Sequence, residues 1–245
     1  MKKENAITVS NLHISYRGIT KFSIKRSLFK GKKNSKEIFE AVKGISFEVE
    51  KGKILGLIGK NGSGKSTTLR ALAGIFCPDK GKIDLHGNTI SLLSIGVGFQ
   101  PKLTGYENIY LSGMLLGFSE AEIKEKEKEI IEFADIGEFI YKPVKTYSSG
   151  MHSKLAFAIT AILETDIILI DEVLSVGDAA FKEKSYNKMK ELISDENRTV
   201  VIVSHSLDTI KNLCDEVLWL HEGKIKAYGK PDSVIEEYKE FMETK

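Results

Sequence analysis

An eight-residue segment of this chain has the spacing G-x-x-x-x-G-K-[ST], which is typical of a phosphate-binding loop. Its residues are Gly59, Lys60, Asn61, Gly62, Ser63, Gly64, Lys65 and Ser66. Glycines let backbone N–H groups turn inward around a phosphate, and the N-terminus of the following helix adds partial positive charge. We expect Lys65 to reach the β- and γ-phosphates of a nucleoside triphosphate. We expect Ser66 to coordinate Mg²⁺ and Thr67 to complete the nucleotide-binding set.

Two adjacent carboxylates, Asp171 and Glu172, follow the apolar run at residues 167–170. Such a run is typical of a parallel strand that is buried on both faces. Ligands of open α/β sheets bind at the carboxyl ends of the strands, so Asp171 is predicted to hold Mg²⁺, directly or through water. Glu172 is then placed to polarise the attacking water. An Asp-Glu pair alone is more often a solvated strand end, and its position after a phosphate loop favours the catalytic interpretation.

A third motif, Tyr147-Ser148-Ser149-Gly150-Met151, opens a helical run, and a helix N-terminus with a serine and a glycine suits γ-phosphate oxygens. The order of these motifs resembles that of the ATP-binding subunits of ABC transporters over essentially the whole chain, with this segment in the place of the family's usual Leu-Ser-Gly-Gly-Gln. The resemblance implies that Ser148, Ser149 and Gly150 contact the ATP that is bound by a second copy. Two head-to-tail copies would then hold two ATP molecules between them.

The resemblance assigns roles to three further residues. His205, after the strand expected at 200–203, matches the switch histidine that contacts the γ-phosphate and supports Glu172. Gln100 matches the glutamine that joins the Mg²⁺ shell and links the helical subdomain to the nucleotide. Asp178 lies where the family has its D-loop, from which it would communicate with the active site of the partner copy.

The aromatic side chain that stacks on adenine has two candidates. Tyr16 is the leading one and Phe39 the second. A buried core tyrosine is the rival interpretation of Tyr16, because an amphipathic aromatic often packs in the core with its hydroxyl satisfied.

Departures from the common pattern point to one branch of the family. The signature has Ser149 in place of Gly and Met151 in place of Gln, and Val173 stands where Pro is usual. With the segments at 98–108 and 175–181, these variations are similar to the branch that exports surface polysaccharides, which includes teichoic-acid, O-antigen and capsule exporters. The resemblance implies an ATP-hydrolysing subunit that drives a lipid-linked polymer across the membrane through a separate permease.

Residues 18–40 form an insertion that is longer than the short turn of many relatives. Its basic residues are Lys21, Lys25, Arg26, Lys30, Lys32, Lys33 and Lys36, with Glu37 as the single acid before Glu40. Apolar residues, Phe22, Ile24, Leu28 and Phe29, are interleaved with them. We expect part of the insertion to form an amphipathic helix at the membrane surface, near anionic lipid or phosphate-bearing polymer. This region resembles the gate helix of polysaccharide exporters, and a solvated basic loop is the alternative.

The elements that must position these residues alternate between strand and helix. Strands are expected at residues 7–9, 45–49, 54–58, 167–170 and 200–203, with short strands near Ile83, Leu85 and Ile90, and helices at 66–73, 106–116, 120–133 and 233–242. We expect an α/β fold, with a P-loop NTPase (RecA-like) core, a small antiparallel β subdomain and an inserted α-helical subdomain. Residues 1–245 are expected to form one ATP-binding domain, with the helical subdomain at about 100–163 and a short hairpin and helix at about 223–245.

Composition agrees with a soluble motor domain that stays in the cytoplasm, and the resemblance implies that it lies peripherally at the cytoplasmic face of the membrane. The chain has 245 residues, 42% of them hydrophobic, so one substantial core is expected. No apolar run approaches the roughly twenty residues that span a bilayer, and the N-terminus lacks the apolar stretch of a signal peptide. The 36 basic and 34 acidic residues give a net charge of +2, which is no general signal for nucleic acid. Cys77 and Cys214 fit a reducing cytosol.

The resemblance implies that the permease docks in a groove between the glutamine loop and the helical subdomain. Candidate contact residues are Leu103, Tyr106, Tyr110, Leu111, Met114 and Leu115, although this spacing is also that of ordinary helix core. An importer or a drug or lipid efflux ATPase remains the alternative function, since it would share the catalytic residues. Ser149 and the basic insertion favour export of a polymer.

Overall fold

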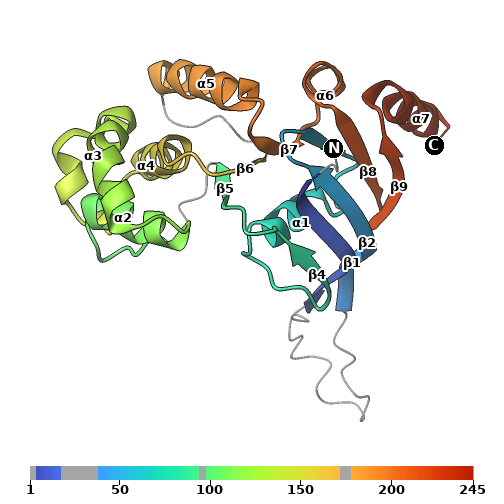
Figure 1. Ribbon diagram of the computed structural model, residues 1–245, viewed down its shortest axis with the longest axis horizontal. Helices are drawn as coiled ribbons and strands as arrows, with labels where there is room; N and C mark the ends of the chain where they lie inside the picture. Colours follow the sequence, from blue (N-terminus) through green and yellow to red (C-terminus); the bar gives the residue numbers. More distant parts are fainter. Residues whose placement is uncertain (1–3, 18–37, 94–97, 172–177, 245) are drawn as a thin grey trace, which may run out of the picture.

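The computed structural model describes residues 4–17, 38–93, 98–171 and 178–244 (Figure 1). Its strands are β1 Asn5–Arg17, β2 Ile38–Glu50, β3 Ile54–Ile58, β4 Lys80–Asp84, β5 Ile90–Leu93, β6 Ile167–Ile170, β7 Thr199–Val203, β8 Glu216–His221 and β9 Lys224–Gly229. Its α-helices are α1 Lys65–Leu72, α2 Gly105–Leu115, α3 Glu120–Ala134, α4 Ser149–Ile162, α5 Ala179–Ser194, α6 Leu207–Leu213 and α7 Pro231–Glu243. Short 3₁₀ helices lie at Gly137–Tyr141 and Val144–Thr146.

A six-stranded sheet in the order β5-β6-β7-β3-β8-β9 forms the centre of the molecule. Its first five strands are parallel, and β9 is antiparallel to β8. Side chains of successive strand residues point to opposite faces, so each apolar strand contributes side chains to a core on either side of the sheet. In β6, Leu169 packs into one core with α1, whereas Ile168 and Ile170 pack into the other with α4, α5, α6 and α7. The continuous apolar run therefore reflects burial on both faces.

A three-stranded antiparallel sheet, in the order β2-β1-β4, covers the α1 side of the core. The prediction of short strands at 7–9 and 45–49 was right in type and wrong in length, since β1 and β2 each run for thirteen residues. β2 begins at Ile38, so the last three residues of the expected insertion belong to a strand. Register shifts interrupt the pairing of β1 with β2, which obscures the alternating pattern in the sequence. Residues 18–37 of the insertion lie outside the described residues.

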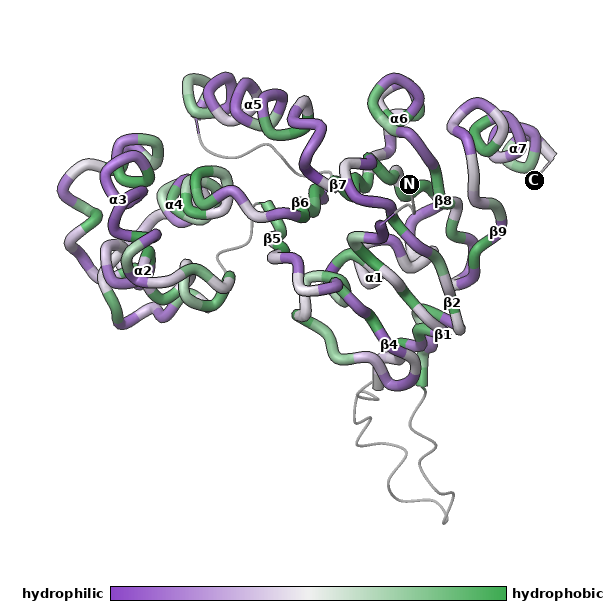
Figure 2. Tube along the Cα trace, viewed as in Figure 1, coloured by the Kyte–Doolittle hydropathy of each residue, from purple (hydrophilic) through white to green (hydrophobic). Residues whose placement is uncertain are grey.

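The helices α2, α3 and α4 pack on one another around a core of their own, beside the two sheets (Figure 1). Each of α2 and α3 begins with a complete capping box, Thr104 with Glu107 and Ser119 with Glu122. Figure 2 shows the outer helices α3 and α5 as largely hydrophilic and β5 as hydrophobic. Among the described residues, no helix combines the length and the apolar character needed to cross a bilayer.

Candidate nucleotide-binding site

The phosphate loop joins β3 to α1 in a conformation that only glycine allows at two points. A Cβ on Gly59 would lie 2.2 Å from the carbonyl oxygen of Leu220, and Gly64 has a φ of 105° with the carbonyl oxygen of Ala41 close by. Lys65 is 6% exposed, and its Nζ donates to the carbonyl oxygens of Gly59 at 2.7 Å and Lys60 at 3.1 Å. The lysine side chain therefore lies back across its own loop.

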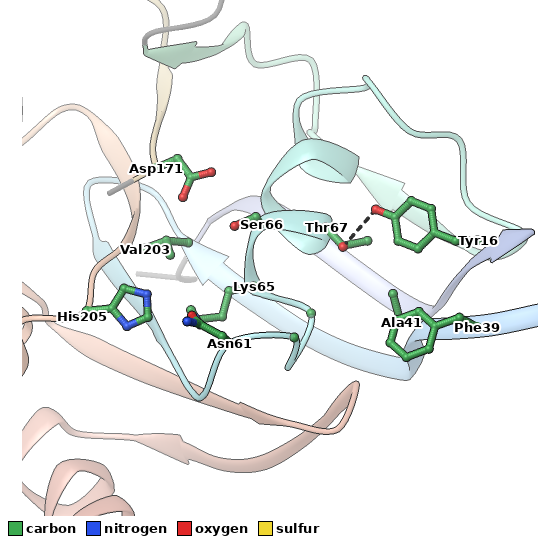
Figure 3. Close-up of a pocket in the computed structure, with 12 residues that line it drawn as sticks. Tyr16, Phe39, Ala41, Asn61, Lys65, Ser66, Thr67, Asp171, Val203 and His205 are labelled. Carbon is green, nitrogen blue, oxygen red and sulfur yellow. Dashed lines mark hydrogen bonds between the residues drawn. The ribbon is translucent and has the colours of Figure 1, made fainter. Parts of the chain in front are cut away.

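One pocket brings this loop together with residues from four strands or strand ends (Figure 3). Its lining residues are Tyr16, Phe39, Ala41, Asn61, Gly62, Gly64, Lys65, Ser66, Thr67, Asp171, Val203 and His205. Eight of the sixteen residues predicted to bind the nucleotide thus line one pocket. Gly59, Lys60 and Ser63 belong to the same loop but are not among these lining residues. The Ser63 side chain is 4% exposed, and its Oγ has no hydrogen-bond partner among the described residues.

The polar end of the pocket holds Ser66, Asp171 and His205 (Figure 3). Parallel pairing of β6 with β7 sets Ile170 opposite Ile202, so the residues that follow both strands emerge at the same edge of the sheet. The hydroxyl of Ser66 and the carboxylate of Asp171 are hard oxygen donors, the kind of ligand that Mg²⁺ prefers. Glu172, the predicted base, lies outside the described residues.

The glutamine predicted to join this site is not among the pocket's lining residues. Gln100 is exposed, and its backbone N–H donates to Oδ1 of the buried Asn108 at 2.7 Å. The structure therefore describes Gln100 as part of an ordered turn beside α2, with its contribution to the metal site still a prediction.

Tyr16 and Phe39 form the aromatic end of the pocket and face each other across the β1–β2 pair. Tyr16 is 39% exposed, so the interpretation of this residue as a buried core tyrosine is wrong. Its hydroxyl forms a hydrogen bond with Oγ1 of Thr67 at 3.0 Å, and its ring is nearly perpendicular to that of Phe76, with 5.8 Å between the ring centroids. Phe39 is 59% exposed. Both rings border the pocket, and the assignment of the adenine stacker remains a prediction.

The signature segment stands at the start of α4. Ser148 is the N-cap residue, and its hydroxyl accepts a hydrogen bond from the backbone N–H of Met151 at 3.2 Å. Ser149 and Gly150 occupy the first turn of the helix. None of residues 147–151 is among the described residues that line the pocket.

Asp178 caps α5 through a hydrogen bond from the backbone N–H of Phe181 at 3.0 Å. Its other carboxylate oxygen lies 2.7 Å from Nζ of Lys154 on α4. Hydrogen bonding to Lys154 and to the cap holds the pKa of Asp178 below its usual range. The predicted D-loop aspartate is thereby tied to the signature helix of the same chain.

Both the sequence and the fold of this chain are similar to those of known proteins. Residues 42–175 match the family model described as ABC transporter. The chain belongs to the ABC transporter family. Two solved structures with the same fold are an ATP-binding subunit of an ABC transporter and a dimeric ATP-binding cassette in a post-hydrolysis state bound to ADP and Pi. The first has a TM-score of 0.69 and 23% sequence identity, and the match covers 96% of this chain and 93% of that one. The second has a TM-score of 0.65 and 21% identity, and the match covers 92% of this chain and 98% of that one. The predicted family and fold class are confirmed.

Curated relatives of this ABC protein carry export names. It is 47% identical over 206 residues to the teichoic acids export ATP-binding protein TagH of Bacillus anthracis, a match that covers 84% of this chain and 37% of the relative. It is 42% identical over 215 residues to the O-antigen export system ATP-binding protein RfbB of Klebsiella pneumoniae, covering 88% of this chain and 85% of the relative. The chain also spans 48% of an O-antigen export relative from Myxococcus xanthus, so it corresponds to about half or less of several relatives.

Sequence reasoning missed several residues that shape the site of this ABC cassette. Ala41 and Val203 line the pocket with small apolar side chains that carry no reactive or polar group, so only the fold reveals them. Lys154 could have been found from its spacing, because it lies three residues after the end of the signature on the same helix. Asn108 is fully buried, and the burial of an amide side chain cannot be read from one sequence.

Proposed function

We propose that this chain is the ATP-hydrolysing subunit of an ABC exporter that drives a cell-surface polysaccharide across the cytoplasmic membrane through a separate permease. The observation that carries the proposal is the single pocket in which Lys65 and Ser66 of the phosphate loop meet Asp171 and His205. The export names of relatives that are 42–47% identical support the polymer class.

In this proposal each of several residues of the chain has a separate role in ATP binding and hydrolysis. The ammonium group of Lys65, now bonded to loop carbonyl oxygens, turns to the β- and γ-phosphates of ATP and makes charge-assisted hydrogen bonds. Glu172 polarises the attacking water, and His205 contacts the γ-phosphate and supports Glu172. Tyr16 holds the adenine ring at the other end of the pocket.

The residues present fit Mg²⁺ through oxygen donors. Ser66 and Asp171 border one pocket, and the side-chain oxygen of Gln100 is the proposed third donor. Bound Mg²⁺ would neutralise charge on the β- and γ-phosphate oxygens during the transfer. These residues also orient the nucleotide, because two of the three follow strands or loops at the same edge of the sheet.

A second copy completes the site. The signature residues Ser148, Ser149 and Gly150 are not among the described residues lining this chain's pocket, which fits their use by a neighbouring chain. A structural neighbour is a dimeric cassette bound to ADP and Pi. We therefore propose a head-to-tail dimer that closes on two MgATP and is reset by hydrolysis.

The permease partner is proposed to dock on the helical part of the chain at the cytoplasmic face of the membrane. Of the candidate contact residues on α2, Met114 and Leu115 are 52% and 58% exposed, whereas Tyr106, Tyr110 and Leu111 are half-buried. Exposed apolar side chains at the end of a helix suit burial against a partner helix. The lipid-linked polymer would be recognised through this permease, and no nucleic-acid partner is proposed.

The test uses the full chain co-expressed with its permease in a host that lacks its own exporter for the polymer. Wild type should hydrolyse ATP and place the polymer on the cell surface, and Lys65→Ala should lose both. Polymer that reaches the surface with Lys65→Ala would refute the proposal. Hydrolysis that responds to an imported solute or to a drug, with no effect on the polymer, would favour the alternative transporter classes.

A further inference from the structure

The segment after Gln100 and the segment before the signature run side by side in this structure. Three backbone hydrogen bonds join residues 101–105 to residues 142–145, with N···O distances of 2.9, 2.9 and 3.3 Å. Thr104 and Pro143 also form an antiparallel bridge. Such pairing makes the end of the glutamine loop and the approach to the signature a single unit.

Asn108 fixes the glutamine end of this unit. Its side chain is 0% exposed, and its Oδ1 accepts the backbone N–H of Gln100 at 2.7 Å. Its Nδ2 lies 2.8 to 3.3 Å from the carbonyl oxygens of Gln100, Leu103 and Thr104. A buried amide with all its hydrogen-bonding groups engaged holds the turn in one conformation.

Tyr147 fixes the signature end. Its hydroxyl donates to the carbonyl oxygen of Phe139 at 2.7 Å. A Cβ added to Gly105 would lie only 2.1 Å from that hydroxyl oxygen, so the tyrosine occupies the space that a side chain at position 105 would need. Gly105 has no positive φ that would demand glycine for backbone reasons, which leaves close approach as the reason for it.

The contact lies one residue from the group that is proposed to serve the second ATP. Tyr147 immediately precedes Ser148, the N-cap of α4. A ring whose hydroxyl is bound by the carbonyl oxygen of Phe139 and lies close against Gly105 fixes the backbone from which α4 begins. A second contact supports the same junction, because the ring of Phe99, next to Gln100, lies 4.8 Å from the ring of His152 on α4.

We propose that Gly105 and Tyr147 form a positioning pair that sets the signature serine relative to the glutamine loop, so that the signature of one copy meets the ATP of the other. Tyr147 acts through Ser148 and does not itself touch ATP. The inference rests on the proposed ATP-driven dimer. It adds that the geometry of this dimer depends on a tyrosine and a glycine that face each other.

The experiment uses the full chain with Glu172→Gln as background, which should trap the ATP-bound dimer. Gly105→Ala is added alone and together with Tyr147→Phe, which keeps the ring and removes the hydroxyl that the new methyl group would strike. Dimer formation is measured against ATP concentration by size-exclusion chromatography with light scattering. Binding of a fluorescent ATP analogue to the monomer and the thermal unfolding midpoint are measured for each variant.

We expect Gly105→Ala to raise the ATP concentration needed for dimer formation by roughly tenfold, because forced overpacking displaces the tyrosine. Monomer affinity for ATP should stay within about twofold, since the phosphate loop is remote from the change. Adding Tyr147→Phe should restore most of the loss. If Gly105 and Tyr147 only stabilised the fold, Gly105→Ala would not weaken dimer formation alone, and removing the Tyr147 hydroxyl oxygen would not restore dimer formation specifically.

Three results would overturn the inference. Gly105→Ala could dimerise like its parent, or it could lose dimer formation, ATP binding and thermal stability together. It could also stay impaired with Tyr147→Phe, which would assign the clash to Ile140, whose Cδ1 and carbonyl oxygen lie 3.1 Å from the added Cβ. Failure of the Glu172→Gln parent to dimerise with ATP would instead count against the proposed function, so the two failures are distinguishable.

Discussion

Asn108 allows a prediction whose size follows from its contacts. Its Oδ1 accepts one hydrogen bond from Gln100, and its two N–H groups share three carbonyl oxygens. Two N–H groups make at most two full hydrogen bonds, so the side chain contributes about three in all. At about 1 kcal/mol for each, Asn108→Ala should lower the free energy of unfolding by about 3 kcal/mol. A typical substitution costs about 1 kcal/mol.

Guanidinium unfolding of the full chain measures this effect with two probes. Far-UV circular dichroism reports the helices, and the fluorescence of Trp219, the single tryptophan, reports the core under α7. Coincident curves would justify a two-state free energy. Asn197→Ala is the matched control, because it makes the same chemical change at an exposed turn and should stay within about 0.5 kcal/mol of wild type.

The reasoning about Asn108 fails if its variant loses less than about 1 kcal/mol, or no more than the Asn197 control. Either result would mean that water replaces the lost amide groups, and that the turn after Gln100 needs no internal anchor. A loss near the expected size with unchanged m-value would locate the effect in the folded state.

Three further predictions concern ionisable and aromatic groups. Lys154→Met should lower the melting temperature at neutral pH, and the difference should vanish as the pH falls through the lowered pKa of Asp178, because the pair stabilises only while the carboxylate is charged. Burial raises the pKa of the Cys214 thiol to about 12, so a disulfide reagent at about pH 8 should modify only the exposed Cys77 in the native chain and both thiols in denaturant. Tyr16→Ala should weaken ATP binding roughly tenfold by removing a stacking ring, yet leave binding of inorganic tripolyphosphate unchanged; equal losses for both ligands would refute the stacking role.

The parts of the fold that the sequence predicts well are those where local pattern and tertiary burial agree. The strand at 54–58 matches β3 residue for residue, and the expected helix at 66–73 differs from α1 by one position at each end. In both cases a glycine-rich loop marks the boundary, and an apolar run has only one way to be buried.

Prediction was weaker where long-range pairing decides the structure. β2 extends seven residues before the expected start at 45, through Lys43 and Gly44, because pairing with β1 supports residues that have no strand signal of their own. The pairing of Tyr16 with Phe39 belongs to the same extension. The two aromatic residues could therefore be predicted from the sequence, but their placement opposite each other could not. Polar anchors such as Asn108 escape notice because exposed and buried asparagines look alike in one sequence.

The capping geometry of Ser148 bears on how one residue can serve both its own helix and a second copy. A hydroxyl carries two acceptor lone pairs and one O–H donor. In this structure a lone pair of Ser148 takes the backbone N–H of Met151, which satisfies one of the open groups at the start of α4. The donor remains suited to a phosphate oxygen, which accepts and cannot donate when it is ionised. Capping and phosphate binding therefore use different parts of the same hydroxyl, and a rigid approach through Tyr147 would let the dimer form without loss of the cap.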